Sequence, residues 1–240
     1  MSTAFAEKAR KVVCIGRNYA DHITELNNAR PKAPFFFLKP PSSMLLPGGG
    51  PVLVPRGVNV HYEVELALVM GQTLKDFAVA GRDRATVNAE ALAAIEGYAL
   101  AIDMTGRNVQ DNIKAKGLPW TTAKGFDTFL PISAYVEKSQ IPDPANVTLS
   151  LTVNKQSPPN QYDSTNLMLF PIPEILSSIS SVMTIQPGDI ILTGTPKGVG
   201  SVKPGDHIDA SIEVDGKVIA ESVISVDVAD KGGIYDFVPQ

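Results

Sequence analysis

Cysteine, histidine and long apolar runs are scarce in this chain, and each scarcity excludes something. The 240 residues contain one cysteine, Cys14, so no intrachain disulfide can form and a reducing compartment is expected. With only three histidines as well, a zinc centre of sulfur and imidazole ligands is disfavoured. No apolar stretch approaches the roughly 18 residues that cross a bilayer. No block of Lys or Arg indicates nucleic acid or an anionic membrane as a partner.

The remaining composition is that of one compact, enzyme-sized unit. Hydrophobic residues make up 44% of the chain and charged residues 19%, with a formal net charge of −4. Neither a repeat nor a shift in composition divides the sequence, so we expect a single domain over residues 1–240. Residues 1–11 have neither a signal-peptide core nor the Arg- and Ser-rich composition of a transit peptide, so the sequence does not clearly indicate a cellular compartment.

Short apolar and β-branched runs at close spacing predict an α+β fold that is rich in β structure. Strands are expected at 11–16, 61–70, 98–104, 131–136, 147–153, 189–193, 207–214 and 217–228. Helices are expected at 18–26, 86–96, 107–116 and 172–183. This spacing favours a barrel-like or rolled-sheet core with a few flanking helices.

Two glutamates interrupt the apolar run from His61 to Met70. Alternate side chains share one face of a strand, so Glu63 and Glu65 should point the same way, about 7 Å apart. Two carboxylates on a buried face repel each other and lose hydration, which favours a hard divalent cation such as Mg²⁺, Mn²⁺ or Ca²⁺ between them. The alternative is a half-exposed strand whose polar face carries two solvated acids.

Asp103 is the third acid of interest, near the end of the apolar stretch 98–104. An unpaired carboxylate would be costly there. Three such acids on two strands, in a chain poor in Cys and His, indicate a hard-cation site rather than zinc. A cation held by three carboxylates usually keeps water ligands, which substrate oxygens can replace.

Three other side chains are candidates through their surroundings. Lys124 lies among apolar residues close to Trp120, which suits either a salt-bridge partner or a catalytic cation. Arg107 and Gln110 would share one face of a helix. Arg107 could grip a carboxylate with two hydrogen bonds, or form an ordinary surface salt bridge.

An acid–base pair is suggested by His22 and Glu25, three residues apart on the predicted helix 18–26. The carboxylate would orient the imidazole and favour its protonated form. The alternative is a surface histidine with an ordinary neighbour. Further along, the glycine-rich segment 194–200 lacks the Walker spacing, which excludes a nucleotide site of that type. Its backbone N–H groups and the Thr195 hydroxyl can still bind an anion.

These stretches resemble the fumarylacetoacetate hydrolase family. Seven segments carry the resemblance: Gly-Arg-Asn-Tyr-Ala-Asp-His (16–22), Phe-Leu-Lys-Pro (37–40), Glu-Val-Glu-Leu (63–66), Asp-Met-Thr-Gly-Arg-Asn-Val-Gln (103–110), Lys-Gly-Leu-Pro-Trp (116–120), Ala-Lys-Gly-Phe-Asp-Thr-Phe (123–129) and Gly-Asp-Ile-Ile-Leu-Thr-Gly-Thr-Pro-Lys-Gly-Val-Gly (188–200). They span nearly the whole chain in order. The match is best with the small mitochondrial members, which are acylpyruvases, oxaloacetate decarboxylases and oxaloacetate tautomerases. Segments 25–28 and 34–40 point to the fungal-type branch.

The resemblance implies a fold, an ion and an assembly. The fold would be a mixed β-sandwich or rolled β-barrel with flanking helices, as in the C-terminal domain of that family, and the protein a homodimer. Mg²⁺ or Mn²⁺ would be held by Glu63, Glu65 and Asp103. Location would be mitochondrial, with a cytoplasmic location as the alternative. Asn154-Lys155 stands where relatives commonly have Asn-Gly, which puts one hairpin turn in doubt.

The resemblance also implies roles for side chains around the ion. Residues 17–34 would form a lid that carries the catalytic pair His22 and Glu25, with Lys124 as a further catalytic group. The substrate would be contacted by Arg17, Arg107, Gln110 and Thr195.

The expected activity is a Mg²⁺-dependent reaction of enolisable 2-oxo acids that passes through an enolate. The leading interpretation is hydrolysis of the C–C bond of acylpyruvates, decarboxylation of oxaloacetate to pyruvate, or both. An oxaloacetate keto–enol tautomerase is a close alternative, because the same residues would serve all three reactions. A non-catalytic cation-binding module is an alternative of a different class.

Overall fold

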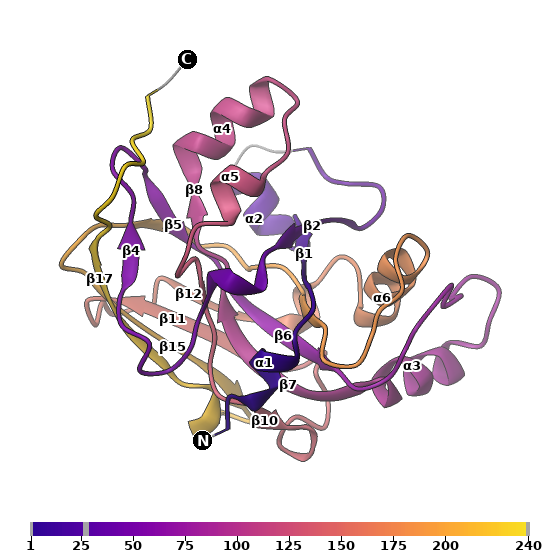
Figure 1. The fold of residues 1–240 in the computed structure, drawn as a ribbon. Coiled ribbons are helices and arrows are strands. Elements are labelled where there is room, and N and C mark those ends of the chain that lie inside the picture. The colour runs from indigo at the N-terminus through magenta and orange to yellow at the C-terminus, as the bar shows by residue number, and fades with distance from the viewer. Residues whose placement is uncertain (1, 26–28, 239–240) are drawn as a thin grey trace.

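The computed structural model describes residues 2–25 and 29–238, and two large β-sheets form its centre (Figure 1). The first sheet has the strand order β10 (Val136–Glu137), β7 (Ile95–Ile102), β6 (Val64–Met70), β13 (Ile190–Leu192), β1 (Val12–Gly16) and β2 (Phe35–Lys39). Neighbouring strands are antiparallel except for β1 and β13, which are parallel. The sheet is therefore mixed, as the predicted fold class requires.

The second sheet has the order β12 (Gln161–Ser164), β11 (Thr148–Val153), β15 (His207–Val214), β17 (Ile224–Asp230) and β4 (Val52–Val54), with β16 (Lys217–Val218) paired to β15. Two small sheets complete the β structure. They are β14 (Gly200–Val202), β5 (Val60–Tyr62) and β8 (Thr105–Gly106), and the pair β3 (Met44–Leu45) with β9 (Leu130–Pro131).

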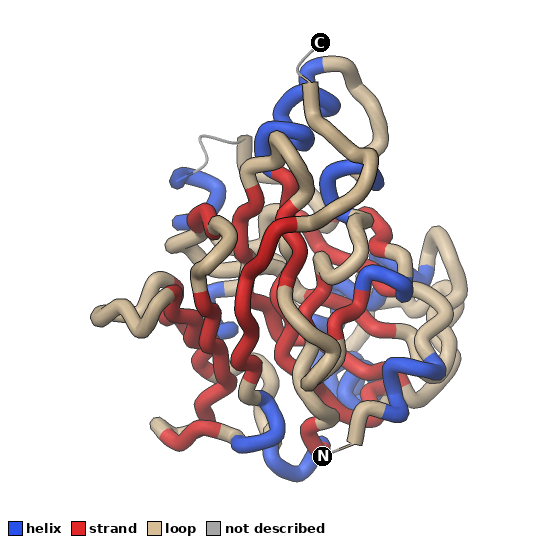
Figure 2. Tube along the Cα trace, turned by 60° about the vertical axis from the view of Figure 1, so that its left-hand side comes forward, coloured by secondary structure: helices blue, strands red, loops and turns tan. Residues whose placement is uncertain are grey.

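Helices lie at the periphery of the sheets (Figures 1 and 2). They are α1 (Ala4–Lys8), α2 (Ala20–Glu25), α3 (Arg84–Ala93), α4 (Arg107–Ala115), α5 (Thr121–Lys124) and α6 (Ile172–Ser180). Two of them, α4 and α5, lie together at one end of the molecule, and α3 and α6 lie together at another side. No helix of the described residues is long and apolar enough to cross a membrane.

Strand β6 is buried on both faces, which explains its nearly continuous apolar sequence. Leu66 and Leu68 enter one hydrophobic core, whereas Ala67 and Val69 enter a second core on the opposite face. Glu65 precedes these residues with the parity of Ala67, so its carboxylate emerges at the end of the second face. The predicted alternation along this run is therefore present, and it places an acid at the edge of a dry core.

Two predicted strands are wrong in extent. The segment predicted as 131–136 is split between β9 and β10, which belong to different sheets, because the chain crosses between them and Ser133 Oγ accepts the Leu100 N–H at 2.9 Å. The segment predicted as 217–228 is interrupted at 220–222. There Ser222 Oγ donates to Ile219 O at 2.7 Å and accepts the Ile212 N–H at 2.9 Å, which turns the chain back before β17.

Smaller differences concern helix ends and one turn. Helix α3 ends at Ala93, and the last residues predicted for it begin β7. The predicted helix 18–26 is α2, and its last predicted residue lies outside the described residues. The doubtful hairpin does form between β11 and β12. Asn154 and Lys155 adopt φ values of 53° and 58°, and the Asn154 side chain bonds to Asp206 and the His207 backbone, which supports the left-handed turn without glycine.

The exposed face of the second sheet carries a hydrogen-bonded histidine. His207 Nδ1 lies 2.6 Å from Asp227 Oδ1, and Nε2 lies 2.9 Å from Ser225 Oγ and 3.2 Å from Asp209 Oδ1. The hydrogen bond to Asp227 is the main cause that raises the pKa of His207 above its ordinary value. The imidazole therefore links β15 to β17, and its protonated form is favoured by these contacts.

We expect His207→Gln to destabilise the protein mainly at acidic pH. A raised pKa in the folded state means that the stabilisation is fully present below the pKa of the unfolded chain, about 6.5, and is lost as pH rises through the folded value. Chemical denaturation should show a loss of about 0.2–1 kcal/mol near pH 5.5 and little loss near pH 8.5, as for an exposed ion pair. An equal loss at both pH values would contradict this linkage.

Candidate active site

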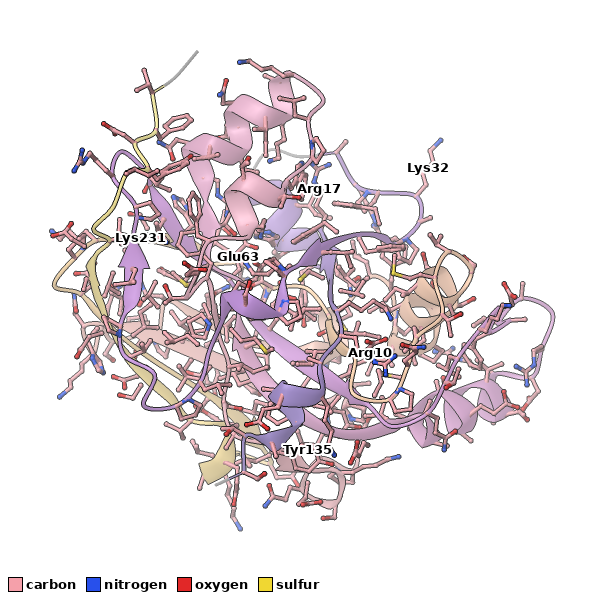
Figure 3. The ribbon with its side chains drawn as sticks, in the orientation of Figure 1. Arg10, Arg17, Lys32, Glu63, Tyr135 and Lys231 are labelled. Atoms are coloured by element: carbon pink, nitrogen blue, oxygen red, sulfur yellow. The ribbon has the colours of Figure 1, made fainter. Side chains whose placement is uncertain are left out.

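Three acids converge where the first sheet meets the small β5–β8 sheet. Glu63 lies in the break between β5 and β6, Glu65 lies in β6, and Asp103 follows β7. Because β6 and β7 are antiparallel, with Glu65 opposite Ala101, Asp103 comes opposite Glu63, and its N–H donates to Glu63 O at 2.8 Å. One carboxylate oxygen from each acid lies within 4.8 Å of the others, and all three residues are buried. Figure 3 shows Glu63 inside the molecule, while Lys32 of the predicted lid projects from the surface.

Basic side chains surround two of the three acids. Lys124 Nζ lies 2.6 Å from Asp103 Oδ2 and 3.0 Å from Glu63 Oε2. Lys39 Nζ lies 2.7 Å from Asp103 Oδ1, and an Arg107 guanidinium nitrogen contacts Glu63 Oε1. Burial opposes the ionisation of Glu63, but Lys124 and Arg107 outweigh it and hold the pKa of Glu63 below its usual range. These contacts keep the Glu63 carboxylate ionised in a dry setting.

Glu65 is different, because it has no direct cationic partner among the described residues. Its Oε2 accepts the Gly194 N–H at 2.6 Å. Burial, followed by the charges of Asp103 and Glu63, raises the pKa of Glu65 well above its ordinary value. Within the described residues, Glu65 is therefore the one acid of the trio whose charge no basic side chain directly balances. All three acids offer oxygen donors, and each is held by a hydrogen bond from another residue, so the arrangement fits Mg²⁺ or Mn²⁺.

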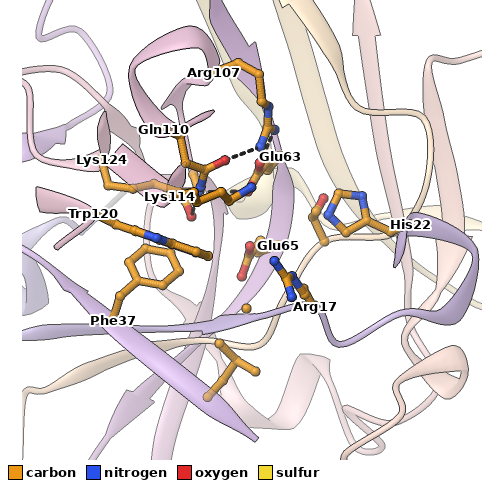
Figure 4. Close-up of a pocket in the computed structure, with 14 residues that line it drawn as sticks. Arg17, His22, Phe37, Glu63, Glu65, Arg107, Gln110, Lys114, Trp120 and Lys124 are labelled. Atoms are coloured by element: carbon orange, nitrogen blue, oxygen red, sulfur yellow. Dashed lines mark hydrogen bonds and ion pairs between the residues drawn. The ribbon is translucent and has the colours of Figure 1, made fainter. Parts of the chain in front are cut away.

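The acids open into a small cavity of about 30 Å³, measured as the space available to the centres of water-sized molecules. Arg17 and His22 lie on one side of Glu65, and Phe37 and Trp120 lie on the other (Figure 4). The cavity is lined by every residue predicted for the site except Glu25: His22, Lys124, Arg17, Arg107, Gln110, Thr195, Glu63, Glu65 and Asp103. Segments far apart in the sequence therefore meet around one space.

Arg107 is already engaged within the protein. One of its terminal nitrogens contacts Glu63, and the other donates to Gln110 Oε1 at 2.7 Å. Its Nε is buried without a partner. The predicted shared helix face of Arg107 and Gln110 is thus present. Arg107 does not, however, form two hydrogen bonds to the carboxylate of Glu63.

His22 differs from the sequence-based prediction in its protonation. Its Nδ1 is buried without a hydrogen bond and lies 3.7 Å from Glu25 Oε2, while the Glu25 carboxylate accepts the Gly198 N–H at 3.1 and 3.2 Å. Burial is the largest effect and lowers the pKa of His22 below its ordinary value. Glu25 does favour the protonated form, as expected, but the loss of hydration on burial outweighs this attraction, so the neutral imidazole is favoured. A neutral imidazole can accept a proton.

Helix α2, which carries His22, is attached to distant parts of the chain on its N-terminal side. On its N-terminal side, the buried Asn18 side chain donates to Thr193 O at 2.8 Å and to Phe170 O at 3.1 Å. On the helix itself, Asp21 forms an exposed ion pair with Lys197, with Oδ2 and Nζ 2.8 Å apart. Part of the predicted lid, residues 26–28, lies outside the described residues. The motion of the lid stays a prediction.

Sequence reasoning gave no role to several groups of the site. Lys39 supports Asp103, and Phe37 and Trp120 form the aromatic wall. Lys114 lines the cavity, with its ammonium 5.5 Å from the Trp120 ring centre. Lys39 had a usable signal, since a lysine that ends the apolar segment 35–38 needs a buried counter-charge. The others had none, because their positions depend on how α4 and α5 pack against each other and α5 against β2.

Comparison with known proteins now identifies the family. The chain matches the family described as fumarylacetoacetate (FAA) hydrolase C-terminal over residues 11–223. This chain belongs to the fumarylacetoacetate hydrolase family. The family assignment and the fold class expected from the sequence are thereby confirmed.

Similar proteins act on related small molecules. The mitochondrial oxaloacetate tautomerase oaa1 of Schizosaccharomyces pombe is 53% identical over 206 residues, which cover 85% of this chain and 89% of that protein. The mitochondrial oxaloacetate decarboxylase of Dictyostelium discoideum is 47% identical over 209 residues, which cover 87% of this chain and 91% of that protein.

A solved structure of the family contains a metal ion. The crystal structure of fumarylpyruvate hydrolase from Pseudomonas aeruginosa in complex with Mn²⁺ and pyruvate has a TM-score of 0.79 and 31% identity to this chain. The match covers 93% of this chain and 91% of that one. The chain thus belongs to a family of enzymes, and one relative binds Mn²⁺.

Glu65→Gln is expected to weaken Mn²⁺ binding by about 100-fold or more, because loss of even an outer partner of a metal ligand costs roughly 10–100-fold. The raised pKa of Glu65 adds a second expectation, which is that wild-type affinity falls with decreasing pH well before an ordinary glutamate is protonated. Titration calorimetry with Mn²⁺ measures both. Glu90→Gln, at an exposed ion pair with Arg82, is the control, and equal affinity in the two variants would refute the site.

Lys197→Met is expected to loosen α2 without unfolding the protein. Loss of an exposed ion pair should speed amide hydrogen exchange of residues 20–25 by about twofold to fivefold. Lys231→Met removes a comparable exposed pair with Asp127 and serves as the control. The combined change Asp21→Lys and Lys197→Asp should restore slow exchange. Unchanged exchange in Lys197→Met would show that the ion pair does not hold the helix.

Proposed function

We propose that this protein is a Mg²⁺- or Mn²⁺-dependent oxaloacetate keto–enol tautomerase. One observation carries the proposal: a neutral, buried imidazole and a carboxylate trio short of positive charge face the same cavity. The names of the S. pombe and D. discoideum relatives support oxaloacetate as the substrate. The proposal thus ranks tautomerisation first, whereas the interpretation from the sequence ranked acylpyruvate hydrolysis and oxaloacetate decarboxylation first.

The charges of the cavity suit a substrate with two carboxylates. Four basic side chains line it beside the three acids: Arg17, Arg107, Lys114 and Lys124. The chain as a whole has a net charge of −4, so this basic cluster is local and would attract small anions to the cavity.

Arg17 is suited to bind the second carboxylate of oxaloacetate. Its guanidinium lies over the Phe35 ring, 5.6 Å from the ring centre, and has no carboxylate partner among the described residues. Its backbone φ is 58°, an uncommon conformation for arginine that turns the chain from β1 towards α2. Such strained positions concentrate at functional sites.

His22 and Lys124 would divide the remaining chemistry. When bound by Glu63, Glu65 and Asp103, Mg²⁺ or Mn²⁺ would supply Lewis-acid stabilisation of negative charge on the substrate. Neutral His22 would take a proton from C3 of the keto form and pass it to the 2-oxygen to give the enol, and it would carry the proton back when the enol returns to the keto form. Burial opposes the charge of Lys124, but Asp103 and Glu63 outweigh it and raise its pKa, so Lys124 would act as a fixed positive charge rather than a proton donor.

Decarboxylation of oxaloacetate is the second candidate, and the name of the D. discoideum relative favours it. The same residues would serve, with carbon dioxide leaving from the second carboxylate. An ion pair with Arg17 would stabilise that carboxylate in its charged state and oppose the loss. This effect of Arg17 places tautomerisation ahead.

Assembly and location complete the proposal. We propose a homodimer, as in the resemblance, and a mitochondrial location, which the names of both relatives support.

Following oxaloacetate by NMR with and without Mg²⁺ tests the activity. We expect the enol form to decay faster with enzyme than with Mg²⁺ alone, with no pyruvate formed. His22→Asn should reduce this acceleration by about 10²–10⁴-fold, the usual contribution of a positioned base. Mn²⁺ affinity of the variant serves as the folding control. Formation of pyruvate at the rate of enol decay would instead identify a decarboxylase.

A further inference from the structure

Gln161, the first residue of β12, connects two parts of the site although it does not line the cavity. It is 1% exposed. Its Oε1 accepts the N–H of Val64, between the two glutamates of the acid trio, at 3.0 Å. Its Nε2 lies 2.9 Å from Thr195 Oγ1 and 2.9 Å from Pro196 O. No pattern in the sequence marks this residue.

The orientation of the Gln161 amide is determined by its backbone partners. A backbone N–H can only donate, so the atom that faces Val64 must be the amide oxygen. A carbonyl oxygen can only accept, so the atom that faces Pro196 must be the amide nitrogen. The two partners agree, and the reversed amide would lose both hydrogen bonds.

The fixed amide determines the role of the Thr195 hydroxyl. Because Gln161 Nε2 donates to it, the hydroxyl oxygen acts as the acceptor and its own hydrogen must point elsewhere. No described residue accepts that hydrogen, and Thr195 lines the cavity. We infer that Gln161 is a positioning residue that directs the Thr195 hydroxyl to donate into the cavity, towards an anionic oxygen of the substrate. This inference rests on the proposed binding of 2-oxo acids.

The same loop also positions the acid trio. Gly194 donates its N–H to Glu65, and the next residue provides the hydroxyl. Gly194 has a φ of 98°, and a Cβ there would lie 2.7 Å from Asn18 Cβ, so the close approach requires glycine. Through Val64 and Thr195, Gln161 therefore sets the spacing between the acids and the hydroxyl donor.

A directed donor selects the chemistry of its ligand. A carboxylate or enolate oxygen only accepts, and a hydrogen bond to a charged oxygen is stronger than one to a neutral group. An ammonium at the same place has no lone pair to accept the Thr195 hydrogen and would oppose it. Gln161 thus tunes the cavity for acceptor-only oxygens although it does not line the cavity itself.

Gln161→Glu provides a sharp test, because the variant keeps an acceptor for Val64 and replaces the donor to Thr195 by a second acceptor. The Thr195 hydroxyl would then donate to the introduced carboxylate and turn away from the cavity. Calorimetry with oxalate in the presence of Mg²⁺ should show binding weakened by about tenfold in both Gln161→Glu and Thr195→Val. The double variant should bind no more than about twofold more weakly than Thr195→Val alone, because the hydroxyl is already absent.

Two controls separate this role from a structural one. Mn²⁺ affinity in Gln161→Glu should stay within about threefold of wild type, whereas a displaced β6 would weaken Mn²⁺ and oxalate binding together. Gln156→Glu adds the same charge on the exposed loop of the same hairpin and should leave oxalate binding unchanged. If Gln161→Glu does not fold, Gln161→Met, which frees the hydroxyl to rotate, should give a smaller loss than Thr195→Val.

The outcomes are distinct. The role of Gln161 would be overturned if the losses of oxalate affinity in the two single variants multiplied in the double variant. It would also be overturned if Gln161→Glu lost Mn²⁺ affinity in parallel with oxalate affinity. Wild-type protein that binds Mn²⁺ but not oxalate would instead overturn the proposed function.

Discussion

The site depends on how three buried carboxylates are neutralised. Lys124 bridges Asp103 and Glu63, and Lys39 and Arg107 complete the pairing of these two acids. A buried charge without a partner is costly, so removal of one of these cations would be felt throughout the cluster. Among the three acids of the described residues, Glu65 alone has a backbone N–H as its direct partner, and this imbalance suits the cavity to a divalent ion.

The loop after β13 unites the functional parts of the molecule. Within a few residues it supports Glu65, presents Thr195 to the cavity and contacts α2 through Lys197 and Gly198. Each of these contacts reaches a different segment of the chain. A displacement of this loop would therefore act on the acid trio, the Thr195 hydroxyl and the helix of His22 at the same time.

Much of this arrangement was predictable from the sequence, because the signals were local. Glu63 and Glu65 interrupt an apolar strand, Asp103 ends another, and both patterns correctly indicated buried acids. The protonation of His22 was not predictable, since it depends on how deeply α2 is buried. Gln161 was equally hidden, because its partners are 97 and 34 positions away and the short polar strand Gln-Tyr-Asp-Ser gives no pattern that singles it out. The broken segments 131–136 and 217–228 were missed because side-chain hydrogen bonds of Ser133 and Ser222 redirect the chain.

The aromatic wall of the cavity has an optical consequence. Trp120 is the only tryptophan of the chain, and it packs against Phe37 with Lys114 above its ring. Indole fluorescence of the whole protein therefore originates at one wall of the cavity, beside a positive charge. The intrinsic emission is in effect a built-in probe of what occupies that space, and no label needs to be attached.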